Sequence, residues 1–147
     1  MGATPNPPGT RPDPQQPEGT DLMPRVQHIV VLMMENHSYD NYFGMLERGD
    51  GLLLDKDGKP TPTNPASDGT LVGSYHLPTT SQKDNKVTQS WAASHRQYDD
   101  GKLDGFVVTS GSPAMGYWNA ADLPFYYSLA RTFPLCDRYF GSVLAQT

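Results

Sequence analysis

The apolar positions of this chain fall into a few short clusters separated by polar stretches that are rich in turn-forming residues. The first cluster, VQHIVVLMM at residues 26–34, is apolar except for Gln27 and His28 and is β-branched at its centre. A continuous run of this kind predicts a strand that is covered on both faces, as in a parallel sheet. The run ends on Glu35 and Asn36, so the predicted strand leads directly into two polar side chains.

Two helices are predicted further along the chain. SWAASHRQYDD, residues 90–100, places apolar side chains on one helical face and is followed by Gly101. LPFYYSLARTF, residues 123–133, predicts a second helix with Asp122 as its N-cap and Pro134 as its stop.

Two further strands and one long surface excursion complete the pattern. GFVVTS, residues 105–110, predicts a short strand, and LCDRYFGSVLAQT, residues 135–147, begins like another buried strand. Residues 45–88 carry repeated Gly, Pro, Asn and Asp turn signals, which predict one or two hairpins. Strands that alternate with helices indicate the α/β class with a mostly parallel sheet.

The size of this element set favours a partial domain. About three strands and two helices are few for a doubly wound sheet, where five or six strands are usual. The first 24 residues contain seven prolines and no aromatic residue, so we expect a disordered tail there. Residues 25–147 are then expected to be the N-terminal portion of a larger domain that is incomplete at its C-terminus.

Charge and composition exclude several classes of function. The net charge is −5, from 11 basic and 16 acidic residues, and no basic run is present, which disfavours nucleic-acid binding. The single cysteine, Cys136, excludes an intrachain disulfide and a cysteine-based metal cluster. No apolar stretch approaches the roughly 20 residues of a transmembrane helix. The first residues also lack the pattern of a signal peptide, which leaves the compartment open.

Glu35 and Asn36 are the first candidates for chemistry. Ligands of parallel α/β sheets collect at the carboxyl ends of the strands, and carboxylate and carboxamide oxygens suit a divalent cation. Adjacent side chains of a regular strand point to opposite faces, so both can meet one ion only if the chain turns there. The alternative is a polar turn in front of a helix that Ser38 caps. The spacing alone leaves both interpretations open.

Three blocks of the sequence resemble one known family. VQHIVVLMMENHSYDNYFG resembles the opening of the bacterial phosphoesterase family, in which a strand precedes an E-N-[RH]-S-[FY]-D-x-Y-F-G block. QSWAASHRQYDDGKLDGFV and MGYWNAADLPFYYSLARTFPLCDRYFGSV resemble later segments of the same family, in the same order. The resemblance covers residues 25–147. The family includes phospholipase C of the phosphatidylcholine type and a related acid phosphatase.

The resemblance implies an alkaline-phosphatase-like α/β/α sandwich and a metal-dependent hydrolase of phosphoric esters. It gives Glu35 and Asn36 the role of metal ligands, for a divalent cation whose identity the sequence does not specify. A hydroxyl residue after the C-D-x-Y strand is the family's nucleophile and metal-bound group, and Thr147 falls on that position. Gln146 replaces the proline that usually precedes the nucleophile, and Ser142 is the rival hydroxyl.

His95 is the remaining catalytic candidate. It matches the histidine of the family's S-W-x-x-x-H segment, and a histidine beside a phosphate can donate a hydrogen bond or protonate a leaving group. The alternative is a histidine that packs against Trp91, one helical turn earlier. Both interpretations of His95 remain open.

The resemblance also implies a phosphate ester or a phospholipid as the substrate. Two alternatives accompany the phospholipase C-like reading. One is a phosphomonoesterase of the acid-phosphatase type, which differs only in its substrate pocket. The other is an inactive fragment, since few candidate ligands follow Asn36. Members of the family are often exported, although no export signal is visible in this sequence.

Overall fold

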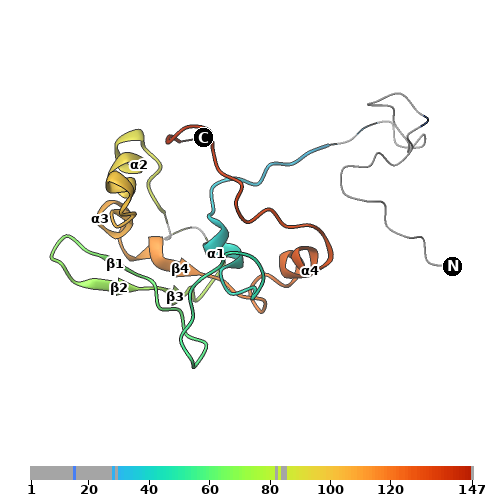
Figure 1. Cartoon of the computed structure of the whole chain (residues 1–147), viewed down its shortest axis with the longest axis horizontal. Helices are drawn as coiled ribbons and strands as arrows, with labels where there is room; N and C mark the ends of the chain where they lie inside the picture. Colours follow the sequence, from blue (N-terminus) through green and yellow to red (C-terminus); the bar gives the residue numbers. More distant parts are fainter. Residues whose placement is uncertain (1–14, 16–27, 29, 82, 84–85, 147) are drawn as a thin grey trace. The chain divides into compact units, whose positions relative to one another are not determined.

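The computed structural model describes residues 15, 28, 30–81, 83 and 86–146, which form short helices and strands of a mixed α/β chain (Figure 1). The chain divides by its internal contacts into two compact units, Met1–Glu35 and Asn36–Thr147. The helices and strands described below belong to the second unit. The predicted tail at residues 1–24 lies outside the described residues, apart from Gln15.

The strand predicted at residues 26–34 is wrong for the described part of this segment. Residue 28 and residues 30–35 form neither helix nor strand, and the side chains from Val30 to Met34 are 64–90% exposed. A parallel strand requires a hydrogen-bonded neighbour, and no described segment pairs with this run. The apolar pattern thus identified a segment suited to burial, yet the side chains of residues 30–34 are largely exposed.

The hairpins predicted within residues 45–88 are confirmed. Strand β1 (Thr63–Pro65) pairs antiparallel with β2 (Leu71–Gly73). The connecting turn contains Asp68, whose carboxylate accepts a hydrogen bond from a backbone amide two residues on. A smaller loop is closed by a bridge between Leu54 and Pro60.

The predicted mostly parallel sheet is not present among the described residues. Strand β3 (Tyr75–His76) pairs in parallel with β4 (Gly116–Tyr117), so the described part of the chain holds one two-stranded parallel sheet and one two-stranded antiparallel sheet. The α/β class is confirmed at this coarser level.

The helix predicted at residues 90–100 is confirmed as α2 (Trp91–Tyr98). The Ser90 Oγ accepts a hydrogen bond from the Ala93 amide at 3.2 Å and so satisfies one of the free amides of the first turn. The helix stops at Asp99, which has a left-handed backbone (φ 41°) and begins the short 3₁₀ turn η1 (Asp99–Gly101).

The second predicted helix is confirmed as α4 (Pro124–Thr132), but its predicted cap is wrong. Leu123 occupies the N-cap position, and Pro124 follows at the first helical position, where its missing N–H costs nothing. The Asp122 carboxylate accepts the Asn119 amide instead, at 2.9 Å. A proline at the first position thus marks the start of this helix better than the acidic residue before it.

Residues 105–110, predicted as a strand, form a helix, α3 (Phe106–Ser110). The buried Asn64 side chain explains this correction. Its Oδ1 accepts hydrogen bonds from the amides of Phe106 (2.9 Å) and Val107 (3.2 Å), and its Nδ2 donates to the Leu103 carbonyl (3.0 Å). A side chain of the hairpin therefore satisfies the first amides of α3, and tertiary contacts override the strand preference of the two valines. The 3₁₀ turn η2 (Ser112–Met115) follows.

The strand predicted at residues 135–147 is also wrong for residues 135–146, which are irregular. Side chains rather than a backbone ladder hold this segment. Asp137 Oδ2 accepts the Asp50 amide at 2.7 Å, and the Arg138 guanidinium donates two hydrogen bonds to the Asp50 carboxylate, at 2.9 and 3.1 Å. The described residues supply no neighbouring strand for it.

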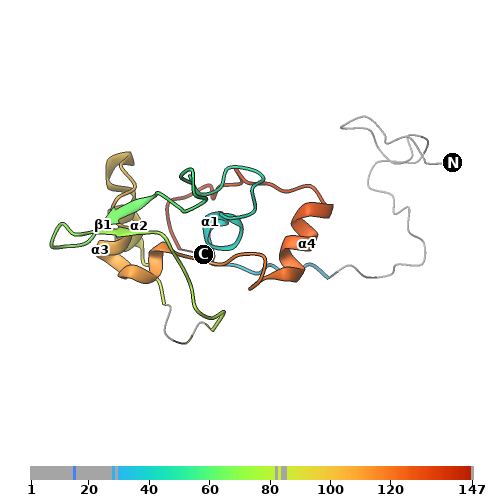
Figure 2. The same ribbon diagram turned by 90° about the horizontal axis from the view of Figure 1, so that it is seen from below.

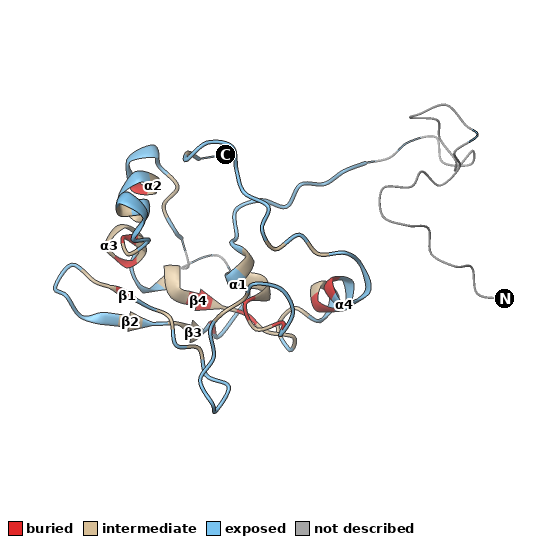
Figure 3. Ribbon diagram, in the orientation of Figure 1, coloured by how far each residue is buried: buried red, intermediate tan, exposed pale blue. Residues whose placement is uncertain are grey.

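The second unit buries its apolar side chains in small groups. Figure 2 shows α3 beside the β1–β2 hairpin and α4 at the other end of this unit, and α2 packs against α3. Buried positions lie on α2, α3, α4 and β4, although most of α2 is exposed (Figure 3). The group around α4 consists of Leu46, Tyr127 and Ala130, with partly buried neighbours at Phe43, Ala120, Leu123 and Leu135. Trp118, after β4, is 1% exposed.

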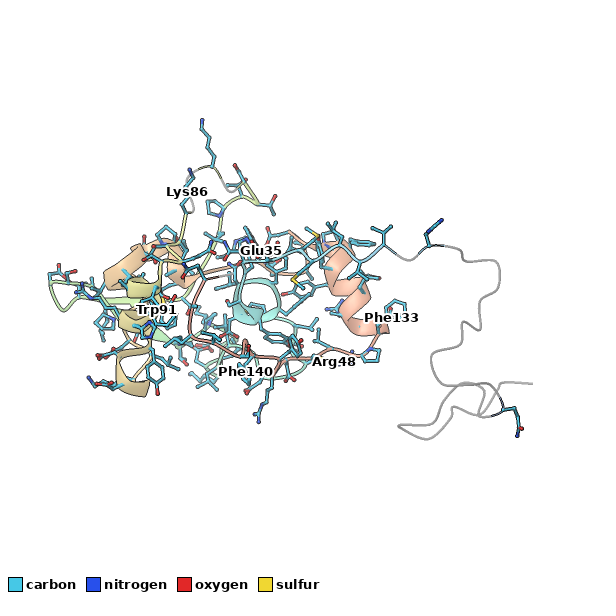
Figure 4. The ribbon with its side chains drawn as sticks, turned by 90° about the horizontal axis from the view of Figure 1, so that it is seen from above. Glu35, Arg48, Lys86, Trp91, Phe133 and Phe140 are labelled. Carbon is cyan, nitrogen blue, oxygen red and sulfur yellow. The ribbon has the colours of Figure 1, made fainter. Side chains whose placement is uncertain are left out.

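Arg48 ties the loop after α1 (Tyr39–Phe43) to the end of α4 (Figure 4). Its Nη1 donates hydrogen bonds to the carbonyls of Ala130 (2.5 Å) and Phe133 (3.4 Å). The last carbonyls of a helix have no partner within the helix, and a cation there also complements the helix dipole. Arg48 therefore acts as a C-terminal cap from a distant segment.

Candidate functional site

The chain turns at Asn36, as two adjacent metal ligands would require. Asn36 has φ of 92°, which a side-chain-bearing residue rarely adopts and which asparagine tolerates better than most. Glu35 is the last residue of the first unit, and Asn36 is the first residue of the second. An uncommon backbone conformation at a polar position is a frequent property of functional sites.

Ser38 caps the helix that follows this turn. Its Oγ accepts the Asn41 amide at 3.1 Å, at the start of α1. The polar turn with a capping serine, considered above as the alternative to a metal site, is therefore present. Capping by Ser38 does not engage the side chain of Asn36, so the two interpretations are compatible.

Asn41 connects this turn to β4. Its Nδ2 donates to the Gly116 carbonyl at 2.8 Å, and its own carbonyl accepts the Trp118 amide at 2.9 Å. The remaining side-chain atom, Oδ1, lies 2.5 Å from His37 Nδ1. Both the main chain and the side chain of Asn41 therefore hold the start of α1 against β4 and the residue that follows it.

Aromatic rings surround His37. Its ring stacks on Tyr42, with centroids 4.9 Å apart, and lies 5.4 Å from the buried Trp118 ring. Trp118 is held in turn by a hydrogen bond from its Nε1 to the Thr79 carbonyl at 3.0 Å. Trp118 is thus an interior residue that packs against the ring of His37.

The second unit contains a cavity of about 980 Å³, which is lined by residues from both ends of this unit's sequence. Asn36 and His37 line it from one end of the chain, and Ala145 and Gln146 line it from the other. This is the structural result that bears most directly on the predicted nucleophile. Thr147 itself lies outside the described residues, but the two residues before it share a cavity with Asn36.

Asp40 is the acidic residue among those that line this cavity. Desolvation by the surrounding atoms raises the pKa of the Asp40 carboxyl, and the negative charge of Asp50 raises it further. Asp40 is not among the site residues predicted from the sequence. In the structure, it occupies the first turn of α1 and adds a carboxylate to the cavity wall.

The other two candidates lie elsewhere. His95 is exposed on α2, where its ring lies 4.2 Å from that of Trp91 and its Nδ1 lies 2.9 Å from the Trp91 carbonyl. It is not among the residues that line the cavity. Ser142, the rival hydroxyl, is exposed and does not line the cavity either. The structure therefore pairs His95 with Trp91, and the catalytic role remains a prediction.

Glu35 and Asn36 are the metal ligands that the family resemblance predicts. Glu35 and Asn36 supply a carboxylate and a carboxamide oxygen, which suit hard divalent ions. Among the described residues, no group of three or more His, Cys, Asp and Glu side chains could hold a metal ion. A cation at Asn36 would therefore keep water ligands or receive others from outside the described residues.

Sequence reasoning missed the supporting network and a histidine–carboxylate pair. Nothing in the local sequence relates Asn41 to Gly116, because the two residues meet only through the β4–α1 contact. His76 Nε2 lies 2.7 Å from Asp122 Oδ2. Hydrogen bonds from the Asn119 amide and His76 lower the pKa of Asp122, although partial desolvation, the largest single influence, opposes them.

Comparison with known proteins identifies the family. The model of the phosphoesterase family matches residues 26–147, so the chain belongs to the phosphoesterase family. It is 34% identical over 136 residues to a hemolytic phospholipase C of Pseudomonas aeruginosa. The matched region covers 87% of this chain and 18% of that protein.

Two further relatives carry similar names. A non-hemolytic phospholipase C of Burkholderia pseudomallei is 34% identical over 138 residues, covering 83% of this chain and 19% of that protein. Phospholipase C B of Mycobacterium tuberculosis is 31% identical over 144 residues, covering 83% and 28%. The chain thus spans between about a fifth and just over a quarter of the length of these relatives. In the described part of the chain, no helix has the length and apolar character needed to cross a bilayer.

Proposed function

We propose that this chain contributes to a metal-dependent hydrolase of phosphoric esters with phospholipase C-like activity. The family match over residues 26–147 supports the reaction class, and the relatives, which are named as phospholipases C, support a phospholipid substrate. The observation that carries the proposal is that the predicted ligand Asn36 and Gln146, the residue before the predicted nucleophile, line one cavity. We further propose an alkaline-phosphatase-like α/β/α sandwich as the complete fold.

Glu35 and Asn36 would hold the divalent cation in this proposal, together with Thr147. When bound, such a cation neutralises charge on phosphoryl oxygens and favours the ionised form of a coordinated hydroxyl. The Thr147 Oγ1 would attack phosphorus in line, forming a bond to phosphorus as the bond to the leaving alcohol oxygen breaks. Water would then attack the phosphothreonine, releasing the phosphate product and restoring the hydroxyl. His95 would protonate the leaving group if the substrate reaches α2.

Hydrolysis of two chromogenic esters tests this function. We expect the protein to release p-nitrophenol from p-nitrophenylphosphorylcholine, and to lose that activity on complete chelation and in Thr147→Ala. Ser142→Ala is the matched control, since Ser142 does not line the cavity, and it should retain activity. Faster release from p-nitrophenyl phosphate would favour the phosphomonoesterase alternative. Activity that survives both chelation and Glu35→Ala would contradict the metal-dependent mechanism.

The other alternative is that the isolated chain is inactive. The described residues give a reason to test this alternative directly. They contain no complete cluster of ionisable metal ligands. Comparing the 147-residue chain with a version joined to the remaining sequence of a relative would separate the two cases. Activity only in the joined protein would assign catalysis to the longer form.

A further inference from the structure

Each hydrogen-bonding atom of Asn41 has a partner of its own. The backbone N–H donates to Ser38 Oγ at 3.1 Å, and the backbone carbonyl accepts the Trp118 amide at 2.9 Å. The side-chain Nδ2 donates to the Gly116 carbonyl at 2.8 Å, and Oδ1 lies 2.5 Å from His37 Nδ1. The family pattern leaves this position unspecified, so the resemblance assigns no role to Asn41.

These contacts determine which nitrogen of the His37 ring carries the proton. The Gly116 carbonyl can only accept a hydrogen bond, so the NH₂ group of Asn41 must be on that side of the amide. Asn41 Oδ1 then faces His37 Nδ1, and an amide oxygen can also only accept, so Nδ1 must be protonated. With the opposite orientation of the amide, two acceptors would meet at Gly116.

Both partners of the Asn41 side chain are held by contacts of their own. Gly116 belongs to β4, which pairs in parallel with β3. A Cβ atom at Gly116 would lie 2.6 Å from side-chain atoms of Leu77, so the chain packs closely at this point. The His37 ring stacks on Tyr42, with the centroids 4.9 Å apart. The amide of Asn41 thus connects two groups that are already fixed.

We propose that Asn41 is a positioning residue for the reaction, which holds His37 in its Nδ1-protonated form at the wall of the cavity. Asn41 and His37 both line this cavity, as does Asn36. Because the hydrogen bond to Asn41 occupies Nδ1, His37 can exchange a proton with a substrate only through its other ring nitrogen, which has a free electron pair in the neutral ring. The inference rests on the proposed function for its substrate, a phosphoric ester, but the form of the His37 ring can be measured without one.

The form of the ring is tested by ¹⁵N NMR of the 147-residue chain in mildly alkaline solution, where imidazole rings are neutral. We expect His37 to be protonated at Nδ1. Asn41→Leu should shift it toward the Nε2-protonated form, because no acceptor remains beside Nδ1. Asn41→Asp should keep the Nδ1 form, since a carboxylate also accepts there, although this variant loses the donor to Gly116.

His95 is the internal control for both variants. Its Nδ1 bonds to the Trp91 carbonyl, which the substitutions do not touch, so its signals should be unchanged. A His37 ring protonated at Nε2 in the wild-type chain would overturn the assignment. The same follows if Asn41→Leu leaves the His37 signals as they are.

Hydrolysis of p-nitrophenylphosphorylcholine by the same variants separates positioning of His37 from a general loss of structure. We expect Asn41→Leu to lower kcat by about tenfold or more, and Asn41→Asp to keep it within about threefold, because only the first changes which nitrogen carries the proton. Both variants lose the bond to Gly116, so equal losses of kcat would assign Asn41 to holding β4 alone and overturn its role toward His37. If the wild-type protein hydrolyses no phosphoric ester, the proposed function fails, and the NMR result still supports or overturns the assignment of the His37 ring.

Discussion

Two carboxamide side chains, Asn41 and Asn64, join segments that are far apart in the sequence. Each uses its amide nitrogen and its oxygen at the same time, to Gly116 and His37 in one case and to the two ends of the turn before α3 in the other. A side-chain amide offers a donor and an acceptor on one rigid, uncharged group. At the residue scale, the candidate site is therefore positioned by neutral side chains that carry no catalytic signature.

Tyr127 is the residue whose ionisation connects most directly to stability. Its side chain is 1% exposed, and burial raises the pKa of the phenol to about 12. In the unfolded chain the phenol titrates near 10. Because the folded pKa is the higher one, the stabilisation is fully present below pH 10 and is lost as pH rises through 12.

We therefore expect the free energy of unfolding to fall between pH 10 and about 12, and Tyr127→Phe to make that fall shallower. Burial also raises the pKa of Tyr39 and Tyr42, so some slope should remain. Urea denaturation at several pH values measures the effect. Tyr139→Phe is the control, since Tyr139 is 89% exposed. An unchanged slope in Tyr127→Phe would contradict the assignment.

At the scale of elements, α2 and α3 approach closely at Gly105. A Cβ atom at Gly105 would overlap the backbone of Arg96 and Gln97, at the end of α2. Backbone atoms cannot rotate away as side chains can, so the two helices would have to separate. At Gly73, in β2, an added Cβ meets nothing within 4 Å.

Gly105→Ala should lower the free energy of unfolding by about 2 kcal/mol or more, as overpacking against a rigid neighbour does. Gly73→Ala should change it by less than about 0.5 kcal/mol. Chemical denaturation of the two variants in parallel checks both values. Equal stability of the two would mean that α2 and α3 do not pack at this distance.

Element predictions succeeded where the signal was local. The apolar face of each helix is set by residues a few positions apart, so α2 and α4 could be found from the sequence, although the predicted cap of α4 was wrong. Residues 105–110 could not be assigned correctly, because the group that satisfies the first amides of α3 is Asn64. Asn36 and Thr147 were selected by resemblance to a family pattern. The cavity that relates Asn36 to Gln146 was not visible in the sequence.

At the scale of the whole molecule, apolar surface is unevenly covered. The run from Val30 to Met34 is largely exposed and has no strand partner among the described residues, whereas Trp118 and Tyr127 are almost fully buried. Local stability depends on buried contacts and on protected backbone hydrogen bonds. The two parts of the chain should therefore differ strongly in protection.

Hydrogen exchange measures this difference in the intact chain. Amides of residues 30–34 should exchange at close to the unprotected rate, and the Trp118 amide, bonded to the Asn41 carbonyl, should exchange roughly a hundredfold more slowly or more. The Asn41→Leu variant serves as a comparison for the Trp118 amide, because its main-chain bond is retained. Strong protection at residues 30–34 would mean that this run pairs or packs.

The sequence by itself determined the family, the two longer helices, the hairpins and the identity of Glu35, Asn36 and Thr147 as candidates. These features depend on residue types at short spacings, which the chain carries wherever it folds. Only the tertiary structure decided that α3 is a helix, that residues 30–35 and 135–146 form no strand, and that Asn41 orients His37. Each of these depends on a hydrogen-bonding partner, or on the lack of one, in a distant segment, and sequence pattern contains no information on which distant groups will meet.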